Sequence, residues 1–203
     1  VLIFDECTSG FRSNFGGLHK LYDVEPDMAM FGKALGNGYA ITAVVGRRSV
    51  MDSAQGTFIS STFWTERIGP SAALKTLEVM EKTKSWEHNT DIGLYFQKLL
   101  KELSDTSGVP VEVFGLPSLT NFVFKSDAHL KFKTLFTQEM LKKGFLASTI
   151  FFASLAHDRV ILDKYFEAAT DVFLMLKKCI DGHIDINKVL EGPICHDGFR
   201  RLN

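Results

Sequence analysis

Cysteine, net charge and long apolar runs are all scarce in this sequence. The chain has 3 cysteines among 203 residues, and Cys7, Cys179 and Cys195 lie far apart. They form neither a disulfide framework nor a zinc-binding pattern, which favours a reducing compartment, the cytoplasm. The formal net charge of -1 gives no reason to expect nucleic acid or a membrane surface as partner. No apolar run approaches the length of a membrane span.

The chain begins as if inside a domain. Residues 1–4 are Val-Leu-Ile-Phe, without the charged region or cleavage site of a signal peptide. Such an apolar run is typical of a buried strand, and a domain rarely begins inside a central strand. We therefore expect the sequence to be the C-terminal part of a longer chain.

The first part of the chain has the pattern of an α/β domain. Three apolar runs predict strands buried on both faces of a sheet, at residues 1–4, 27–32 and 41–46. A helix follows, with Pro70 in its first turn and apolar residues at helical spacing at Ala73, Leu77 and Met80.

The second part reads as a smaller α+β domain with a βαβ-like order. Thr90 is predicted to cap a helix whose apolar stripe is Ile92, Phe96, Leu99, Leu100 and Leu103. Strands are predicted at residues 111–114, 119–124 and 145–152. Two further helices are predicted, one from Phe132 to near Gly144 and one over residues 161–176. The domain boundary is placed near residue 85.

Two polar residues stand at predicted strand ends, where ligands bind in open α/β sheets. Asp5 closes the first apolar run and Lys33 the second. A pyridoxal phosphate enzyme needs such a pair, because a lysine forms a Schiff base with the cofactor and a carboxylate keeps its pyridine nitrogen protonated. Taken singly, an Asp after an apolar run is more often a turn or helix cap, and a Lys beside glycines is more often a solvated loop residue.

The segments around both residues resemble one family. Residues 4–12, Phe-Asp-Glu-Cys-Thr-Ser-Gly-Phe-Arg, resemble the D-E-V-x-x-G-F-R motif of class III aminotransferases. Residues 24–39 resemble the cofactor-lysine segment of that family, at a matching distance. Residues 46–48, the Ser61-Thr62 pair and the Ser-Leu-Ala-His turn at 154–157 are also similar. Glutamate-1-semialdehyde aminomutases and aminomutase-like aminotransferases are the members that the chain resembles most.

This resemblance implies a fold type I pyridoxal phosphate-dependent transferase. Residues 1–85 would be the C-terminal part of its large cofactor-binding domain, and residues 86–203 the small C-terminal domain. The resemblance places Asp5 on the pyridine nitrogen, makes Lys33 the Schiff-base lysine and proton carrier, and brings Thr62 to the phosphate in the partner subunit of a homodimer. The phosphate loop and ring-stacking aromatic of the family precede the matched residues, so this chain supplies only part of the ligand shell.

Two departures from the family pattern leave alternatives open. Cys7 stands where the family commonly has Val, and either packs on one face of the cofactor ring, which is favoured, or is a reactive thiol. Residues 63–67, Phe-Trp-Thr-Glu-Arg, replace a Gly-containing stretch of the aminomutase, which favours an aminotransferase. Glu66 and Arg67 are interpreted as an interface ion pair.

Three other polar positions have weaker functional interpretations. His157 either begins a turn, which is favoured, or contacts substrate. Arg159 is a weak candidate for binding a substrate carboxylate and is more typical of a helix surface. His183, Cys195 and His196 do not have the spacing of metal ligands, so no metal site is predicted.

The sequence thus predicts an aminotransferase that moves an amino group to or from an aldehyde or ketone through Lys33. Its expected partners are an amine donor, a carbonyl acceptor and a second subunit. One alternative is a true glutamate-1-semialdehyde 2,1-aminomutase. The other is a truncated, non-catalytic dimerisation fragment, because the phosphate loop is not found in these residues.

Overall fold

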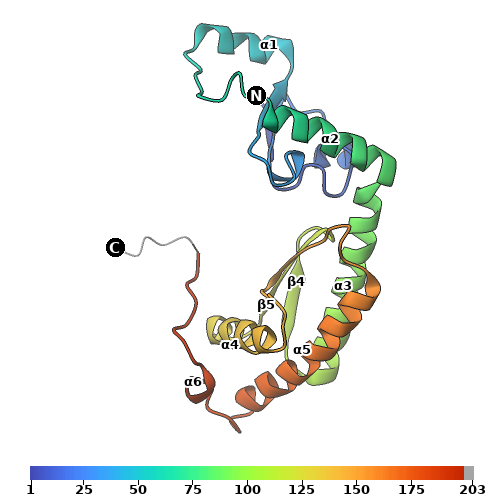
Figure 1. Cartoon of the computed structure of the whole chain (residues 1–203). Coiled ribbons are helices and arrows are strands. Elements are labelled where there is room, and N and C mark those ends of the chain that lie inside the picture. The colour runs from blue at the N-terminus through green and yellow to red at the C-terminus, as the bar shows by residue number, and fades with distance from the viewer. Residues whose placement is uncertain (199–203) are drawn as a thin grey trace. The chain divides into compact units, whose positions relative to one another are not determined.

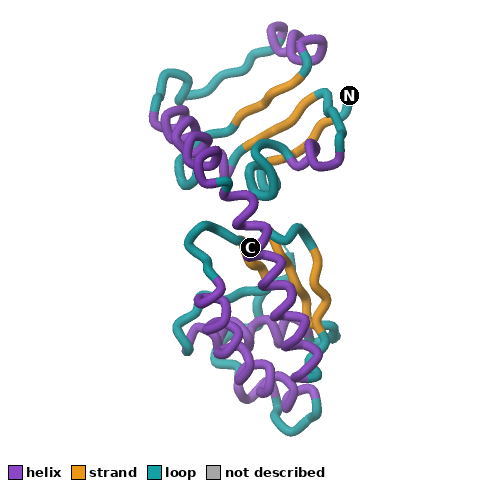
Figure 2. Tube along the Cα trace, turned by 90° about the vertical axis from the view of Figure 1, so that its right-hand side faces the viewer, coloured by secondary structure: helices purple, strands orange, loops and turns teal. Residues whose placement is uncertain are grey.

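The chain divides into two units, residues 1–90 and residues 91–203. The computed structural model describes residues 1–198, and residues 199–203 lie outside the described part (Figure 1). Each unit contains a three-stranded sheet, with strand order β1-β2-β3 in the first unit and β4-β5-β6 in the second (Figure 2). Within residues 1–198, no helix combines the length and apolarity needed to cross a membrane.

The first unit is built on the three strands that the apolar runs predicted. They are β1 (Ile3–Glu6), β2 (Met28–Phe31) and β3 (Ala43–Gly46). β1 pairs parallel with β2, and β3 pairs antiparallel with β2. The helical elements of this unit are η1 (Leu18–Tyr22), η2 (Lys33–Leu35), α1 (Arg48–Met51), η3 (Asp52–Gly56) and α2 (Ile68–Thr83).

The prediction that these strands are buried on both faces is wrong for this chain. Ala73 of α2 packs with Ala29 and Phe31 of β2, which closes a small core on one face of the sheet. On the opposite face, Ile3 is 51% exposed and Val44 is 47% exposed. A sheet of three strands with its helix on one face leaves the other face open to solvent.

The second unit combines helices with an antiparallel sheet. Its strands are β4 (Val111–Phe114), β5 (Leu119–Phe124) and β6 (Ile150–Phe152). Its helices are α4 (His129–Lys142), α5 (Arg159–Ile180) and α6 (Ile186–Val189), and α3 (Ser85–Ser107) leads into them. β6 pairs antiparallel with β5, so the expected βαβ-like order is corrected to an antiparallel β-α-β connection.

Two element boundaries differ from the prediction. Thr90 does not cap a helix, because α3 begins at Ser85 and the Thr90 hydroxyl donates to the Trp86 carbonyl at 2.8 Å. Trp86 packs on Phe15 at a ring-centroid distance of 5.4 Å, and this tertiary contact lies in the first turn of the helix. The strand predicted at 145–152 shrinks to β6, because the backbone after Gly144 forms local hydrogen bonds instead.

The apolar stripes of the second unit form one continuous core. Ile92, Phe96, Leu100 and Leu103 of α3 are buried, as the sequence pattern predicted. Phe124 of β5 contacts Phe136 and Phe173 at centroid distances of 6.0 and 5.9 Å. Burying each such ring stabilises the fold by about 1.5–3 kcal/mol. The second unit is therefore stabilised by apolar packing among its own residues.

Candidate active site

Asp5 and Lys33 lie at the same end of the β1–β2 pair. The parallel register sets Asp5 opposite Met30, and Lys33 follows the last residue of β2 by two positions. Both residues are exposed, and the positive charge of Lys33 acts on the Asp5 carboxylate. The parallel pairing thus joins two residues that are 28 positions apart in the sequence.

The backbone fixes where the Lys33 side chain begins. Gly32 is extended, and Lys33 then takes a left-handed conformation with φ 43°. A non-glycine residue in this region costs roughly 1–2 kcal/mol. The turn holds it there, since the Lys33 carbonyl accepts from the N–H groups of Gly36 at 3.2 Å and Asn37 at 3.1 Å. The amine Nζ donates a hydrogen bond to Thr8 Oγ1.

Asp5 is held as a carboxylate. The Cys7 backbone N–H donates to Asp5 Oδ1 at 3.0 Å. This bond, the Cys7 thiol and the charge of Lys33 together hold the pKa of Asp5 below its usual value. Asp5 is therefore ionised at neutral pH, which is the state needed to bind a protonated ring nitrogen.

Cys7 contacts Asp5 and is close enough to Lys33 to be influenced by its charge. A Cβ at position 32 would lie 3.6 Å from Cys7 Sγ, so the thiol faces the backbone just before Lys33. Its contact with Asp5, followed by burial, raises the pKa of the Cys7 thiol. A protonated thiol is a weak nucleophile, which supports packing over reactivity, and packing on a cofactor ring stays a prediction.

The loop after β1 is anchored by Glu6, which the sequence analysis did not single out. Glu6 is 1% exposed and accepts hydrogen bonds from Ser9 Oγ at 2.5 Å and from the His19 N–H at 3.1 Å. Burial raises the pKa of Glu6, but its several hydrogen bonds outweigh burial and leave the pKa below its usual value. The alternation of β1 was the available signal, because Asp5 and Glu6 must point to opposite faces.

Gly10 is required where this loop passes β2. A Cβ there would lie 2.6 Å from the Glu6 carbonyl oxygen and 2.7 Å from Cδ1 of Phe31. Real Cβ atoms do not approach other atoms so closely, so the motif glycine has a steric reason. The Gly10 N–H also donates to that carbonyl at 2.8 Å, which closes the turn.

Thr62 lies in an exposed turn at residues 62–65, before α2. Its expected contact with a phosphate in a partner subunit stays a prediction. The neighbouring Glu66 has a role within the chain that was not foreseen. Its carboxylate accepts from the N–H groups of Ile68 at 2.6 Å and Gly69 at 3.3 Å, so it caps the start of α2.

His157 and Arg159 both make structural contacts in the second unit. His157 Nδ1 lies 3.0 Å from Ser154 Oγ and 3.1 Å from the Ser154 nitrogen, which forms a turn just before α5. Arg159 pairs with Asp91 at 3.2 Å and lies 4.9 Å from the centroid of the Tyr95 ring. These contacts are those of a turn and of a helix surface.

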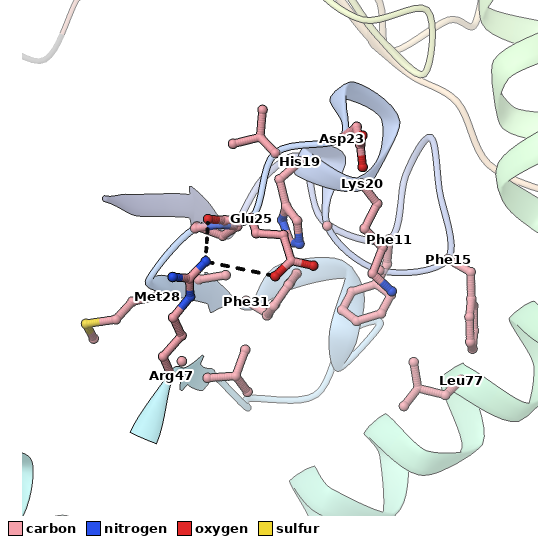
Figure 3. A pocket seen from close by; sticks show the side chains of 17 residues that line it. Phe11, Phe15, His19, Lys20, Asp23, Glu25, Met28, Phe31, Arg47 and Leu77 are labelled. Carbon is pink, nitrogen blue, oxygen red and sulfur yellow. Dashed lines mark hydrogen bonds and ion pairs between the residues drawn. The ribbon is translucent and has the colours of Figure 1, made fainter. Parts of the chain in front are cut away.

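A cavity of about 710 Å³ lies elsewhere in the first unit. Figure 3 shows Phe11, Phe31 and Leu77 beside it, with Arg47 directed towards Glu25. Its lining residues do not include any of the four predicted site residues Asp5, Cys7, Lys33 and Thr62. The cavity therefore continues the small core of this unit and is separate from the edge that carries Lys33.

Comparison with known protein families identifies the family of this chain. The family model described as "Aminotransferase class-III" matches residues 1–171. The chain belongs to this family. Among curated relatives of this class III chain, the 3-aminobutyryl-CoA aminotransferase of Cloacimonas acidaminovorans is 41% identical over 139 residues, covering 68% of this chain and 34% of the relative.

A second relative and a solved structure agree with the family. The glutamate-1-semialdehyde 2,1-aminomutase of a Sulfurihydrogenibium species is 28% identical over 193 residues, covering 87% of this chain and 45% of the relative. The FumI protein of Sphingopyxis sp. MTA144, solved in its PLP internal aldimine form, matches with a TM-score of 0.82 and 24% identity over 88% of this chain and 44% of that one. This class III chain thus has the transaminase fold and spans less than half the length of these proteins.

Proposed function

We propose that the protein containing this chain is a pyridoxal phosphate-dependent aminotransferase, similar to glutamate-1-semialdehyde aminomutases. It would move an amino group to or from an aldehyde or ketone substrate. The observation that supports this most strongly is the placement of Asp5 and Lys33 at one end of the β1–β2 pair. An ionised carboxylate beside a primary amine is the pair that this cofactor requires.

The residues present fit part of a pyridoxal phosphate site. When bound, the cofactor supplies an aldehyde that reacts with amines and a pyridinium ring that accepts electrons. Asp5 would hold the proton on the ring nitrogen, and its lowered pKa keeps it ionised for that task. Lys33 would attach the cofactor and, when free, take and return a proton at the substrate carbon that bears the amine. Cys7 would pack on one face of the ring.

A homodimer with shared sites completes the proposal, with Thr62 binding the phosphate of the partner subunit. Thr62 lies in a segment with large exposed apolar side chains, namely Phe58, Ile59, Phe63, Trp64 and Ile68. Large exposed apolar side chains gathered within eleven residues of sequence support a protein interface at this segment. A cytoplasmic location is supported by the three cysteines, which are free.

Candidate substrates follow from the relatives. The 41% identical relative is named for 3-aminobutyryl-CoA, so β-amino acyl thioesters are the first class to test. A true aminomutase is the second candidate, because relatives at 28% identity carry that name. Product analysis separates the two, since an aminotransferase consumes a separate carbonyl acceptor and leaves its donor as a carbonyl product, whereas an aminomutase converts a single substrate into its isomer.

Replacing Lys33 with Ala in the whole protein tests the proposed function. With the best donor and acceptor of a panel that includes 3-aminobutyryl-CoA, turnover should fall to background in Lys33→Ala. Lys75→Ala is the matched control, because Lys75 is exposed on α2 and pairs with Glu78. Full activity in Lys33→Ala would contradict the proposal. An unreactive wild-type protein that also binds no cofactor would favour the non-catalytic alternative.

A further inference from the structure

Thr8 lies against the proposed catalytic lysine, and the reaction outlined above does not use it. Lys33 Nζ donates its hydrogen bond to Thr8 Oγ1, across 25 positions of sequence. Thr8 is partly buried in the loop after β1, whereas Lys33 is exposed at the start of η2. The hydrogen bond therefore connects a hydroxyl in a half-buried loop to a long, exposed side chain that would otherwise be mobile in solvent.

The loop holds Thr8 from both sides. Ahead of it, the Cys7 N–H is bonded to Asp5. After it, Ser9 and Gly10 both donate to the buried Glu6, at 2.5 Å from the Ser9 hydroxyl and 2.8 Å from the Gly10 N–H. Arg12 Nε donates to the carbonyl of Thr8 itself at 3.2 Å. The hydroxyl thus projects from a loop that is hydrogen-bonded at Cys7, at the Thr8 carbonyl, at Ser9 and at Gly10.

A threonine hydroxyl suits this task chemically. The lysine stem has four rotatable bonds, so an amine without a partner samples many positions. A threonine side chain is stiff because it is β-branched, and its oxygen accepts from either an ammonium or a neutral amine. Thr8 can therefore hold Nζ in both of the protonation states that a proton carrier must adopt.

Asp5 is the competing partner for the same amine. The charge of Lys33 already acts on Asp5, and an amine released from Thr8 would be drawn to that carboxylate. In the proposed function, Asp5 has to remain available for the ring nitrogen. The hydrogen bond to Thr8 gives the amine a different partner and so opposes its pairing with Asp5.

We propose that Thr8 is a positioning residue, whose hydroxyl holds the Lys33 amine away from Asp5 and aligned for attachment of the cofactor and for proton transfer. This inference rests on the proposed function of Lys33. Thr8 binds neither substrate nor cofactor in this role, and its effect is exerted through Lys33.

Three variants of the whole protein test the role of Thr8. Thr8→Val keeps the shape and removes the hydroxyl, and Thr8→Ser keeps the hydroxyl. Thr83→Val is the matched control, because the Thr83 hydroxyl only donates to a helix carbonyl of α2, at 2.8 Å. The probe is pyridoxal 5'-phosphate added to the apoprotein, and circular dichroism checks that each variant is folded.

The main readout is the rate at which Lys33 is labelled. Attachment is followed by visible absorbance, stopped with borohydride and located by peptide mapping. Loss of one hydrogen bond to a charged group predicts labelling about tenfold slower in Thr8→Val, near the wild-type rate in Thr8→Ser and unchanged in Thr83→Val. With a substrate pair, kcat should fall by a similar factor in Thr8→Val while KM stays the same.

Several results would overturn the role of Thr8. One is a rate of Lys33 labelling in Thr8→Val equal to that of the wild-type protein. Another is a labelling rate in Thr8→Ser that is as slow as in Thr8→Val. A raised KM with kcat unchanged would show that Thr8 binds substrate instead. Failure of the proposed function is distinguishable, because then Lys33 takes no label in the wild-type protein either.

Discussion

The two units differ in what holds them together. In the described residues, the core of the first unit consists of four buried residues, Ala29, Phe31, Leu35 and Ala73. The core of the second unit consists of nineteen buried residues from its strands, helices and the segments that connect them. Yet the proposed chemistry lies in the first unit, at Asp5 and Lys33. Geometry there is kept by hydrogen bonds in loops, whereas geometry in the second unit is kept by apolar packing.

This difference shows how a small core can still hold a precise site. Glu6, buried and bonded to Ser9 and His19, ties the loop after β1 to η1. The left-handed turn at Lys33 is tied by its own backbone bonds. These hydrogen bonds set the local geometry but bury little apolar surface. They therefore contribute less to the free energy of unfolding than the burial of aromatic rings such as that of Phe136.

The largest expected effect is on the stability of the second unit. Phe136 is 1% exposed and contacts Phe122, Phe124 and Phe173. Phe136→Ala should lower the free energy of unfolding by about 3–5 kcal/mol through the cavity that it leaves. Chemical denaturation measures this change. Phe114→Ala is the control, because Phe114 is 54% exposed, and an equal loss in both variants would contradict the comparison.

The next effect is on activity, and it belongs to the first unit. Asp5→Asn keeps the shape of the side chain and removes its charge, so the ring nitrogen would lose its ionic partner. We expect kcat/KM to fall by about a hundredfold, with the unfolding of the second unit unchanged. Steady-state kinetics measures the change in kcat/KM, and hydrogen exchange measures the unfolding of the second unit. An active Asp5→Asn enzyme would mean that Asp5 does not serve the cofactor.

The smallest effect is on the acid sensitivity of the first unit. The pKa of Glu6 is lowered on folding, although burial offsets part of the effect of its hydrogen bonds. Its contribution to stability is therefore present above the ordinary carboxyl pKa and is lost as the pH falls through the folded pKa. Protection of amides in residues 1–90, taken relative to the intrinsic exchange rate at each pH, should fall in acid, and Glu6→Gln should remove that dependence. The same acid dependence in Glu6→Gln would assign it to other carboxylates.

The second unit was the easier one to predict. Its helices carry apolar residues at helical spacing, and that local pattern is what its core uses, as Phe96 and Leu100 show. The start of α3 was missed because Trp86 packs on Phe15, a contact that leaves no local signal at Thr90. Burial of the strands of the first unit was overestimated, because an apolar run predicts a strand but not what covers it.

The site was predictable only in part. The placement of Asp5 and Lys33 at one end of the β1–β2 pair was predictable, because strand ends and a family motif both mark them, and their roles toward the cofactor stay predictions. Thr8 and Glu6 were missed because their roles depend on hydrogen bonds to Lys33 and His19, which lie 25 and 13 positions away. Side-chain partners at such separations follow from the pairing of β1 with β2 and the fold of the loop between them.

Mapping where pyridoxal 5'-phosphate attaches tests the central claim most directly. The whole protein is incubated with the cofactor, reduced with borohydride, digested and analysed by mass spectrometry. A single label on Lys33 is the result predicted by the placement of its amine beside Asp5 and Thr8. Labels scattered over exposed lysines such as Lys75 and Lys98, with Lys33 unmodified, would contradict it.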